Sequence, residues 1–178
     1  MTEASNNSTQ TVALWARRWG LDIYRYCRKL LASDSEAEDA MQLVFLQAIQ
    51  DFPRFRGPAT ERHWLLSIAR HRCLDRLKLL RRLPEFPGAP ELEELEVPAS
   101  GPGADDALAA SEAARVLARC IEELPAPTRA AVVLRYHDQL SYERIEAEMG
   151  VSAGALRVRV LRGLSSLRGC LERQGVPW

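Results

Sequence analysis

One stretch near the C-terminus, residues 140–164 (LSYERIEAEMGVSAGALRVRVLRGL), constrains the fold more than any other part of the chain. Ile145 and Met149 are four residues apart, as on one face of a helix, and Gly150 is expected to end that helix. Ser152 is a suitable N-cap for a second helix, because its hydroxyl can accept from free backbone N–H groups. The pattern therefore predicts two short helices joined by a tight turn, a helix-turn-helix.

The second helix of this pair is expected to have one apolar and one basic side. The apolar positions recur at helical spacing: Leu156, Val160, Leu164, Leu167 and Leu171. The opposite side holds Ala155, Val158, Arg159 and Arg162, with Arg157 at its edge. Residues 152–178 contain five arginines and one acid, whereas a merely solvated face mixes both signs. This favours major-groove DNA binding, with Val158 able to meet a thymine methyl; a helix pair in a bundle that binds no DNA is the alternative.

Charge divides the chain into three parts, although its 24 basic and 24 acidic residues balance overall. Residues 1–83 carry 14 basic and 9 acidic groups, a difference of +5, and residues 109–178 carry 10 and 8, a difference of +2. Residues 84–108 carry seven acidic groups, no basic group and several prolines. Because proline and like charges keep a segment extended, we expect two domains joined by an acidic flexible linker over 84–108.

Both domains are predicted to be helical, since no segment alternates apolar and polar residues as a half-buried strand does. The polar residues 1–11 are expected to form a disordered tail. Thr60 and Thr128 are expected to cap the helices that follow them, and Ser33 or Ser35 to begin another. The fold class predicted is all-α, with two small helical domains over 12–83 and 109–178.

The helix expected between residues 35 and 51 has an unusual outward face. Its buried side is expected to hold Met41, Val44, Phe45, Ala48 and Ile49. The outward side holds Asp39, Leu43, Leu46 and Gln50, flanked by Gln42 and Gln47. Two outward leucines are either ordinary surface scatter, the simpler interpretation, or part of a docking surface for another protein.

A basic loop with two phenylalanines precedes the next helix. It covers residues 52–62 (FPRFRGPATER), and residues 54–82 contain nine basic groups and two acids. Because cations follow phosphates and aromatic rings stack on bases, this region suits a single nucleic-acid strand. A solvated helix with long arginine side chains is the alternative.

Other features exclude several function classes. The cysteines Cys27, Cys73, Cys120 and Cys170 are isolated, so we expect buried small hydrophobes rather than disulfides, zinc ligands or redox sensors. No nucleophile–base constellation or phosphate loop is present, so we expect no enzyme activity, cofactor or small-molecule substrate. The chain lacks a long apolar run and a secretory signal, which predicts a cytoplasmic protein.

Three strings in this order resemble the short bacterial sigma factors of the extracytoplasmic-function (ECF) class, within the sigma-70 family. They are YRYCRKLLASDSEAEDAMQLVF, FRGPATERHWLLSIARHRCLDRLKLLRR, and the stretch from IEELPAPTRAAVVLRYHDQLSYERIEAEMGVS to AGALRVRVLRGLSSLR. The resemblance covers residues 14–83 and 111–172. It implies that 12–83 form region 2, which binds core RNA polymerase and reads the −10 element. It also implies that 109–178 form region 4, which reads the −35 element.

In the family's region 2, the second helix docks on the clamp helices of the polymerase β′ subunit. The resemblance implies a polymerase-binding set of Asp39, Gln42, Leu43, Leu46 and Gln47, although the family usually has an acid where this chain has Leu43. In the family the following loop captures a flipped-out base of the non-template strand. The implied −10 set is Arg56, Thr60, Arg62, His63, Trp64, Ser67, Arg70 and His71. The family usually has asparagine where this chain has His71.

Region 4 of the family binds −35 DNA as a duplex and contacts the flap of the β subunit. The implied −35 set is Ser152, Ala155, Arg157, Val158, Arg159 and Arg162. The family pattern is similar to G-T-V-K-S-R-L, whereas residues 154–160 read GALRVRV, so Ala155 and Val158 replace polar residues. We expect the arginines to contact mainly phosphates. In the family the linker approaches the RNA exit path, where an acidic chain mimics nucleic acid.

The resemblance implies a transcription initiation factor that has no catalysis of its own. Its implied partners are core RNA polymerase, promoter DNA and an inhibitory anti-sigma factor, which is often membrane-bound in the family. A helix-turn-helix regulator that acts without core polymerase is the alternative function, and it predicts tight duplex binding by the protein alone.

Overall fold

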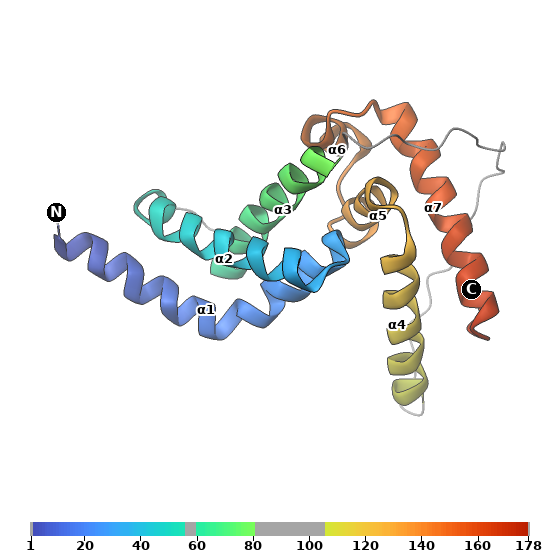
Figure 1. Cartoon of the computed structure of the whole chain (residues 1–178), viewed down its shortest axis with the longest axis horizontal. Coiled ribbons are helices and arrows are strands. Elements are labelled where there is room, and N and C mark those ends of the chain that lie inside the picture. The colour runs from blue at the N-terminus through green and yellow to red at the C-terminus, as the bar shows by residue number, and fades with distance from the viewer. Residues whose placement is uncertain (1, 56–59, 81–105, 178) are drawn as a thin grey trace. The chain divides into compact units, whose positions relative to one another are not determined.

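The computed structural model describes residues 2–55, 60–80 and 106–177. The chain divides into two units, Met1–Leu80 and Arg81–Trp178, and every regular element in the described ranges is helical (Figure 1). Unit 1 contains α1 (Thr2–Leu31), α2 (Asp34–Asp51), a 3₁₀ turn (Phe52–Arg54) and α3 (Glu61–Leu80). Unit 2 contains α4 (Asp106–Glu123), α5 (Ala126–Val132), a π-helical turn (Val133–His137), α6 (Tyr142–Met149) and α7 (Ala153–Arg173). The predicted all-α class with two helical domains is confirmed.

In unit 1, α1 packs against α2 and α3, which also pack against each other. Ile23, Leu30 and Leu65 are among its largest fully buried side chains. The buried residues of α2 are Ala37, Ala40, Val44 and Ala48. The predicted Met41, Phe45 and Ile49 are only half-buried, because the alanines turn the close-packed side of α2 toward its neighbours.

The N-terminal segment differs from the prediction of a disordered tail over residues 1–11. Instead, α1 begins at Thr2. Ser8 and Val12 are four residues apart on this helix, and both are buried. Although this segment is mostly polar, one narrow side of its helix therefore packs against the unit.

The caps predicted outside the helix-turn-helix were correct for two helices and wrong for a third. Ser33 caps α2 by accepting from the N–H of Glu36, and Thr60 accepts from the N–H of His63 at the start of α3. Thr128 caps nothing, because α5 begins at Ala126, two residues earlier. The two prolines around Ala126 are tolerated there, since first-turn residues need no N–H donor within the helix.

In unit 2, α7 packs against α4, α5 and α6. Its apolar stripe is buried as predicted: Leu156, Val160, Leu164, Leu167 and Leu171. The helix-turn-helix also forms as predicted. Ile145 and Met149 are buried, Gly150 ends α6 with a left-handed φ of 65°, and Ser152 caps α7 by accepting from the N–H of Ala155.

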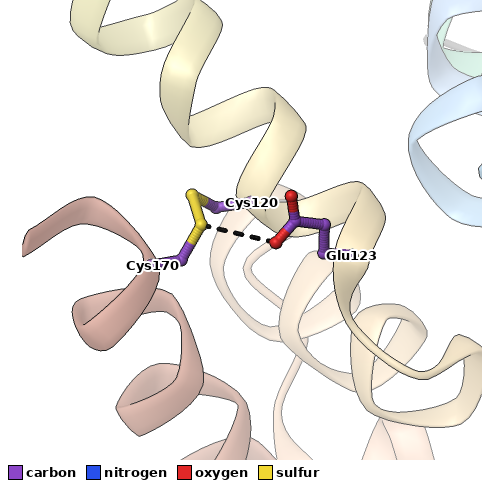
Figure 2. Close-up of a disulfide and its surroundings, with 3 residues drawn as sticks. All are labelled: Cys120, Glu123 and Cys170. Carbon is purple, nitrogen blue, oxygen red and sulfur yellow. Dashed lines mark hydrogen bonds between the residues drawn. A yellow bond between two sulfur atoms is a disulfide. The ribbon is translucent and has the colours of Figure 1, made fainter. Parts of the chain in front are cut away.

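The expectation for the cysteines was correct for one pair and wrong for the other. Cys27 and Cys73 are free and buried, but Cys120 and Cys170 form a disulfide, with their Cα atoms 5.9 Å apart (Figure 2). These two residues are 50 positions apart in the sequence, so only the packing of α4 on α7 brings them together.

Two further expectations concern the linker and the membrane. Of the expected linker over 84–108, residues 106–108 lie in the first turn of α4, and the rest falls outside the described residues. Within the described parts of the chain, no helix is long and apolar enough to cross a membrane.

Candidate functional site

The first three turns of α7 carry the predicted −35 residues on the side away from the core. Ser152, Ala155, Arg157 and Arg162 are exposed, Val158 is 47% exposed, and Arg159 is half-buried. The buried leucine stripe fixes this orientation, since residues that lie opposite it on a helix must face outward. The structure thus exposes all of this set except Arg159, which is half-buried.

Arg157 is held against α6. Its Nη2 lies 3.5 Å from Oε1 of Glu143, and its guanidinium lies 5.1 Å from the centre of the Tyr142 ring. Arg135 lies over the same ring at 5.3 Å. Arg135 and Tyr142 were not among the predicted residues, because only the folded turn brings them near Arg157. Exposed ion pairs contribute little to stability, so Arg157 can exchange Glu143 for a phosphate at small cost.

The carboxyl group of Glu143 lies among basic side chains. Its own backbone N–H, the Ser141 hydroxyl and the nearby arginines Arg157 and Arg135 lower its pKa from the ordinary value. The group therefore stays ionised at neutral pH and can orient Arg157 in the absence of DNA.

The predicted −10 residues extend from Thr60, just before α3, to His71 near the middle of that helix, except Arg56, which falls outside the described residues. Thr60, Arg62, His63 and His71 are exposed, whereas Trp64, Ser67 and Arg70 are half-buried. Arg62 is already engaged, because its Nε donates to Asp22 of α1 at 2.8 Å. The carbonyl of Ser67 lies 2.7 Å from Nδ1 of His71, which fixes that ring beside α3.

Trp64 belongs to an aromatic cluster formed with Trp15, Phe52 and Phe55. Ring centres in this cluster are 4.7 Å apart for Phe55 and Trp64, and 5.5–6.0 Å apart for Trp15 and its three neighbours. The cluster joins α1, the 3₁₀ turn and the start of α3. Trp64 of the predicted −10 set therefore also packs within this cluster, and Trp15 is a member that was not predicted.

The predicted polymerase-binding residues separate into an exposed group and one half-buried residue. Asp39 and Gln42 are exposed, as are Leu43 at 49% and Leu46 at 56%. Gln47 is half-buried, donates to Asp51 and accepts from Arg72 of α3. We call the four exposed residues the α2 face; Gln47 links α2 to α3 at its edge.

Comparison with known sequence families identifies both units. The family described as Sigma-70 region 2 matches residues 15–83, and the family described as Sigma-70, region 4 matches residues 114–167. The first match covers most of unit 1 and ends three residues beyond it, the second lies within unit 2, and the predicted linker lies between them.

Relatives and a solved structure agree with these matches. The ECF RNA polymerase sigma factor SigE of Mycolicibacterium smegmatis is 32% identical over 151 residues, which cover 85% of this chain but only 58% of that relative. SigW of Bacillus subtilis is 28% identical, with 82% and 81% covered, and CarQ of Myxococcus xanthus is 30% identical, with 82% and 80% covered. The fold is similar to that of the sigma factor RpoE from Bartonella quintana, solved in complex with the anti-sigma factor NepR. The TM-score is 0.51, at 19% identity, with 89% of this chain and 96% of that chain covered. The chain belongs to the extracytoplasmic-function family of RNA polymerase sigma factors, which are transcription initiation factors.

Proposed function

We propose that this protein binds core RNA polymerase and directs promoter-specific initiation, with unit 2 reading −35 duplex DNA and unit 1 reading a melted −10 strand. The observation that carries the proposal is the capped helix α7, whose exposed side holds Arg157, Val158 and Arg162 within a helix-turn-helix. The chemistry of RNA synthesis belongs to the polymerase.

For the −35 element, α7 enters the major groove and presents its exposed side to the bases. Arg157 and Arg162 contact mainly phosphates, since most protein–DNA hydrogen bonds go to the backbone. Val158 meets a thymine methyl, which distinguishes that pair from the others. Ala155 and Val158 are then the positions at which the −35 preference of this protein differs from that of its relatives.

For the −10 element, the exposed histidines of α3 face the non-template strand. His63 and His71 supply rings for stacking and hydrogen bonding, while Trp64 on the same helix is anchored in the aromatic cluster. Trapping a flipped base costs a few kcal/mol for each unstacked step, and the protein contacts compensate for that cost.

The α2 face is the proposed contact with the clamp helices of β′, and unit 2 also contacts the β flap. We further propose an anti-sigma factor, held at the membrane in many family members, as the inhibitory partner. Such a partner would cover these same surfaces, and its capture by the purified protein from the native host would test this part.

Leu43→Asp is expected to lower the affinity for core polymerase by tenfold or more without unfolding unit 1. The leucine is half exposed, so a charge costs little in the free protein but is desolvated in the complex. Leu14→Asp on α1 is the matched control, because Leu14 is 62% exposed and lies outside the α2 face. Titration with labelled core polymerase measures the effect. Equal losses for both variants, or loss of helical circular dichroism in Leu43→Asp, would contradict this assignment.

Arg159→Ala is expected to weaken binding to the cognate −35 duplex by about 1–3 kcal/mol if this residue reads a base. Arg168→Ala is the control, because Arg168 lies two turns further along α7 and pairs with Glu172. Fluorescence anisotropy with cognate and scrambled duplexes measures both. A loss that is equal on all sequences would instead assign Arg159 to a phosphate.

Run-off transcription with core polymerase tests the function as a whole. Promoters selected from a random DNA pool in the presence of core polymerase should contain both elements. The alternative, a helix-turn-helix regulator, predicts tight duplex binding without polymerase and no polymerase co-purification. If the purified protein never directs initiation from any selected promoter, the proposal is wrong.

A further inference from the structure

The disulfide between Cys120 and Cys170 joins the helix that opens the described part of unit 2 to the far end of α7 (Figure 2). It lies inside the apolar cluster that holds these helices together. The other buried members of that cluster are Val116, Leu124, Val132, Leu167 and Leu171. The bond is therefore part of the contact between α4 and α7.

The rest of the contact made by α4 is narrow. Among the described side chains of α4, those of Val116 and Cys120 are buried and lie on one side of the helix, whereas Leu117 is 38% exposed. Leu124 continues the buried side just after the helix ends. Apart from Cys120, the described side chains of α4 contribute the buried Val116 and the partly buried Ile121 to this cluster. The bond also closes a loop of 50 residues, which restricts the unfolded chain.

A carboxylate lies beside one sulfur of the pair. Oε2 of Glu123 is 3.7 Å from Sγ of Cys170, and Figure 2 shows this side chain directed at the sulfur. In the closed disulfide that sulfur carries no proton, so a negative charge faces the atom that an incoming thiolate would attack. After reduction, the Cys170 thiol can donate to the carboxylate, which favours the unreactive protonated form. Glu123 thus slows exchange in both directions.

We propose that Cys120 and Cys170 form a reversible dithiol–disulfide switch that sets how firmly α4 is held on α7. The reductant is a dithiol, either small or in a protein. Its thiolate attacks Cys170, the Cys120–Cys170 bond breaks, and Cys120 leaves as a thiolate that takes up a proton. The second thiol of the dithiol then displaces Cys170, so two electrons and two protons pass to the protein and the dithiol becomes a disulfide. The same cyclic disulfide is the oxidant in the reverse direction.

The other two cysteines form an internal control. Cys27 and Cys73 are fully buried in unit 1, and their thiols are in hydrogen-bonding contact. That contact and burial raise the pKa of the Cys73 thiol, which leaves little reactive thiolate. The two redox-active residues are less deeply enclosed, since Cys170 is 6% exposed and Cys120 is 2% exposed. The switch therefore belongs to unit 2.

The consequence for function rests on the proposed role of α7 in −35 binding. Reduction removes the covalent constraint on unit 2, so the unit should unfold at a lower temperature. Between the unfolding temperatures of the two forms, only the oxidised protein should keep its affinity for duplex DNA. The switch would thus couple promoter binding to the thiol–disulfide balance.

The first test measures the redox pair without DNA. Unfolded protein that was prepared under air should react with iodoacetamide at two cysteines, and dithiothreitol-treated protein at four. Reduction should lower the Tm of unit 2 by roughly 10 °C or more. The variant Cys120→Ala/Cys170→Ala should not respond to dithiothreitol, whereas Cys27→Ala should respond fully. Four reactive thiols in air-treated protein, or an unchanged Tm, would overturn the proposal.

The second test measures the role of Glu123. Glu123→Gln should speed reduction by dithiothreitol roughly three- to tenfold, because it removes one negative charge beside the attacked sulfur. Glu112→Gln is the matched control, since Glu112 is exposed on the same helix more than two turns away. Equal reduction rates for Glu123→Gln and the unchanged protein would overturn the protective role of this carboxylate.

The third test separates the switch from the proposed function. Duplex binding is measured for the oxidised and reduced full chain at temperatures across both transitions. Loss of binding only in the reduced form supports the coupling. A normal redox response without duplex binding in either form would overturn the proposed function and leave the switch standing. Equal binding by both forms at every temperature would overturn the coupling.

Discussion

Arg129→Met is expected to lower the free energy of unfolding of unit 2 by roughly 2–4 kcal/mol, one of the two largest effects that we predict. The Arg129 side chain is buried, with 4% of the residue exposed, between α4 and α5. Its Nη1 donates to the carbonyl oxygens of Glu122 at 3.1 Å and Leu124 at 2.7 Å. Because the Glu122 carbonyl lies in the last turn of α4 and the Leu124 carbonyl follows directly after the helix, the guanidinium both completes their hydrogen bonding and complements the helix dipole.

Methionine has a similar length and keeps the packing, so the loss measures the hydrogen bonds and the charge. Arg119→Met is the matched control on α4, where Arg119 is exposed and its replacement should change stability by less than about 0.5 kcal/mol. Urea unfolding measures the change in the free energy of unfolding, and hydrogen exchange of amides in α4 and α5 assigns that change to unit 2. Equal stabilities of the two variants would show that the α4–α5 junction does not depend on Arg129.

The helix-turn-helix was predictable because its determinants are local. The hydroxyls of Ser141 and Ser152 each accept from a backbone N–H three residues further along the chain. Gly150 adopts a left-handed conformation that is unfavourable for most other residues. The outward direction of Val158 follows from the buried stripe alone. The exposure of Leu43 and Leu46 was predictable for the same reason, since helical spacing places them away from Val44 and Ala48.

The features that could not be predicted depend on contacts between distant residues. Arg62 pairs with Asp22, 40 positions away, and Arg72 donates to Gln47, 25 positions away. Because of these partners, Arg62 forms an ion pair with α1 and Gln47 is half-buried against α3. No local sequence pattern indicates either contact. The disulfide is a similar case: Cys120 follows Val116 by one helical turn, and Cys170 lies between Leu167 and Leu171. Each residue therefore resembles an ordinary core position until the two helices pack.

Gly163 is another position whose importance depends on long-range packing. Within the sequence it is only a weak helix former, and its replacement would ordinarily strengthen α7. In the structure a Cβ atom at this position would lie 2.7 Å from Cγ2 of Val132 and 2.9 Å from Cγ2 of Thr128. Both neighbours are short β-branched side chains on α5, which have little rotamer freedom with which to move away. The glycine therefore allows α7 to approach α5 closely.

Gly163→Val is accordingly expected to lower the free energy of unfolding of unit 2 by roughly 2–4 kcal/mol, since overpacking outweighs the gain in helix propensity. Gly169→Val is the matched control on α7. A Cβ there meets only the end of the Arg173 side chain at 3.6 Å, so this variant should be neutral or slightly stabilising. Thermal unfolding followed by circular dichroism measures both variants under the same redox conditions.

A double-mutant cycle then identifies the clash as the cause. Val132→Ala removes the methyl group nearest to position 163 and should itself destabilise the buried cluster. In the presence of Gly163→Val, the stability cost of Val132→Ala should be smaller, so the two substitutions should show a favourable coupling of about 1 kcal/mol or more. Additive losses would assign the effect of Gly163→Val to α7 itself rather than to its contact with α5.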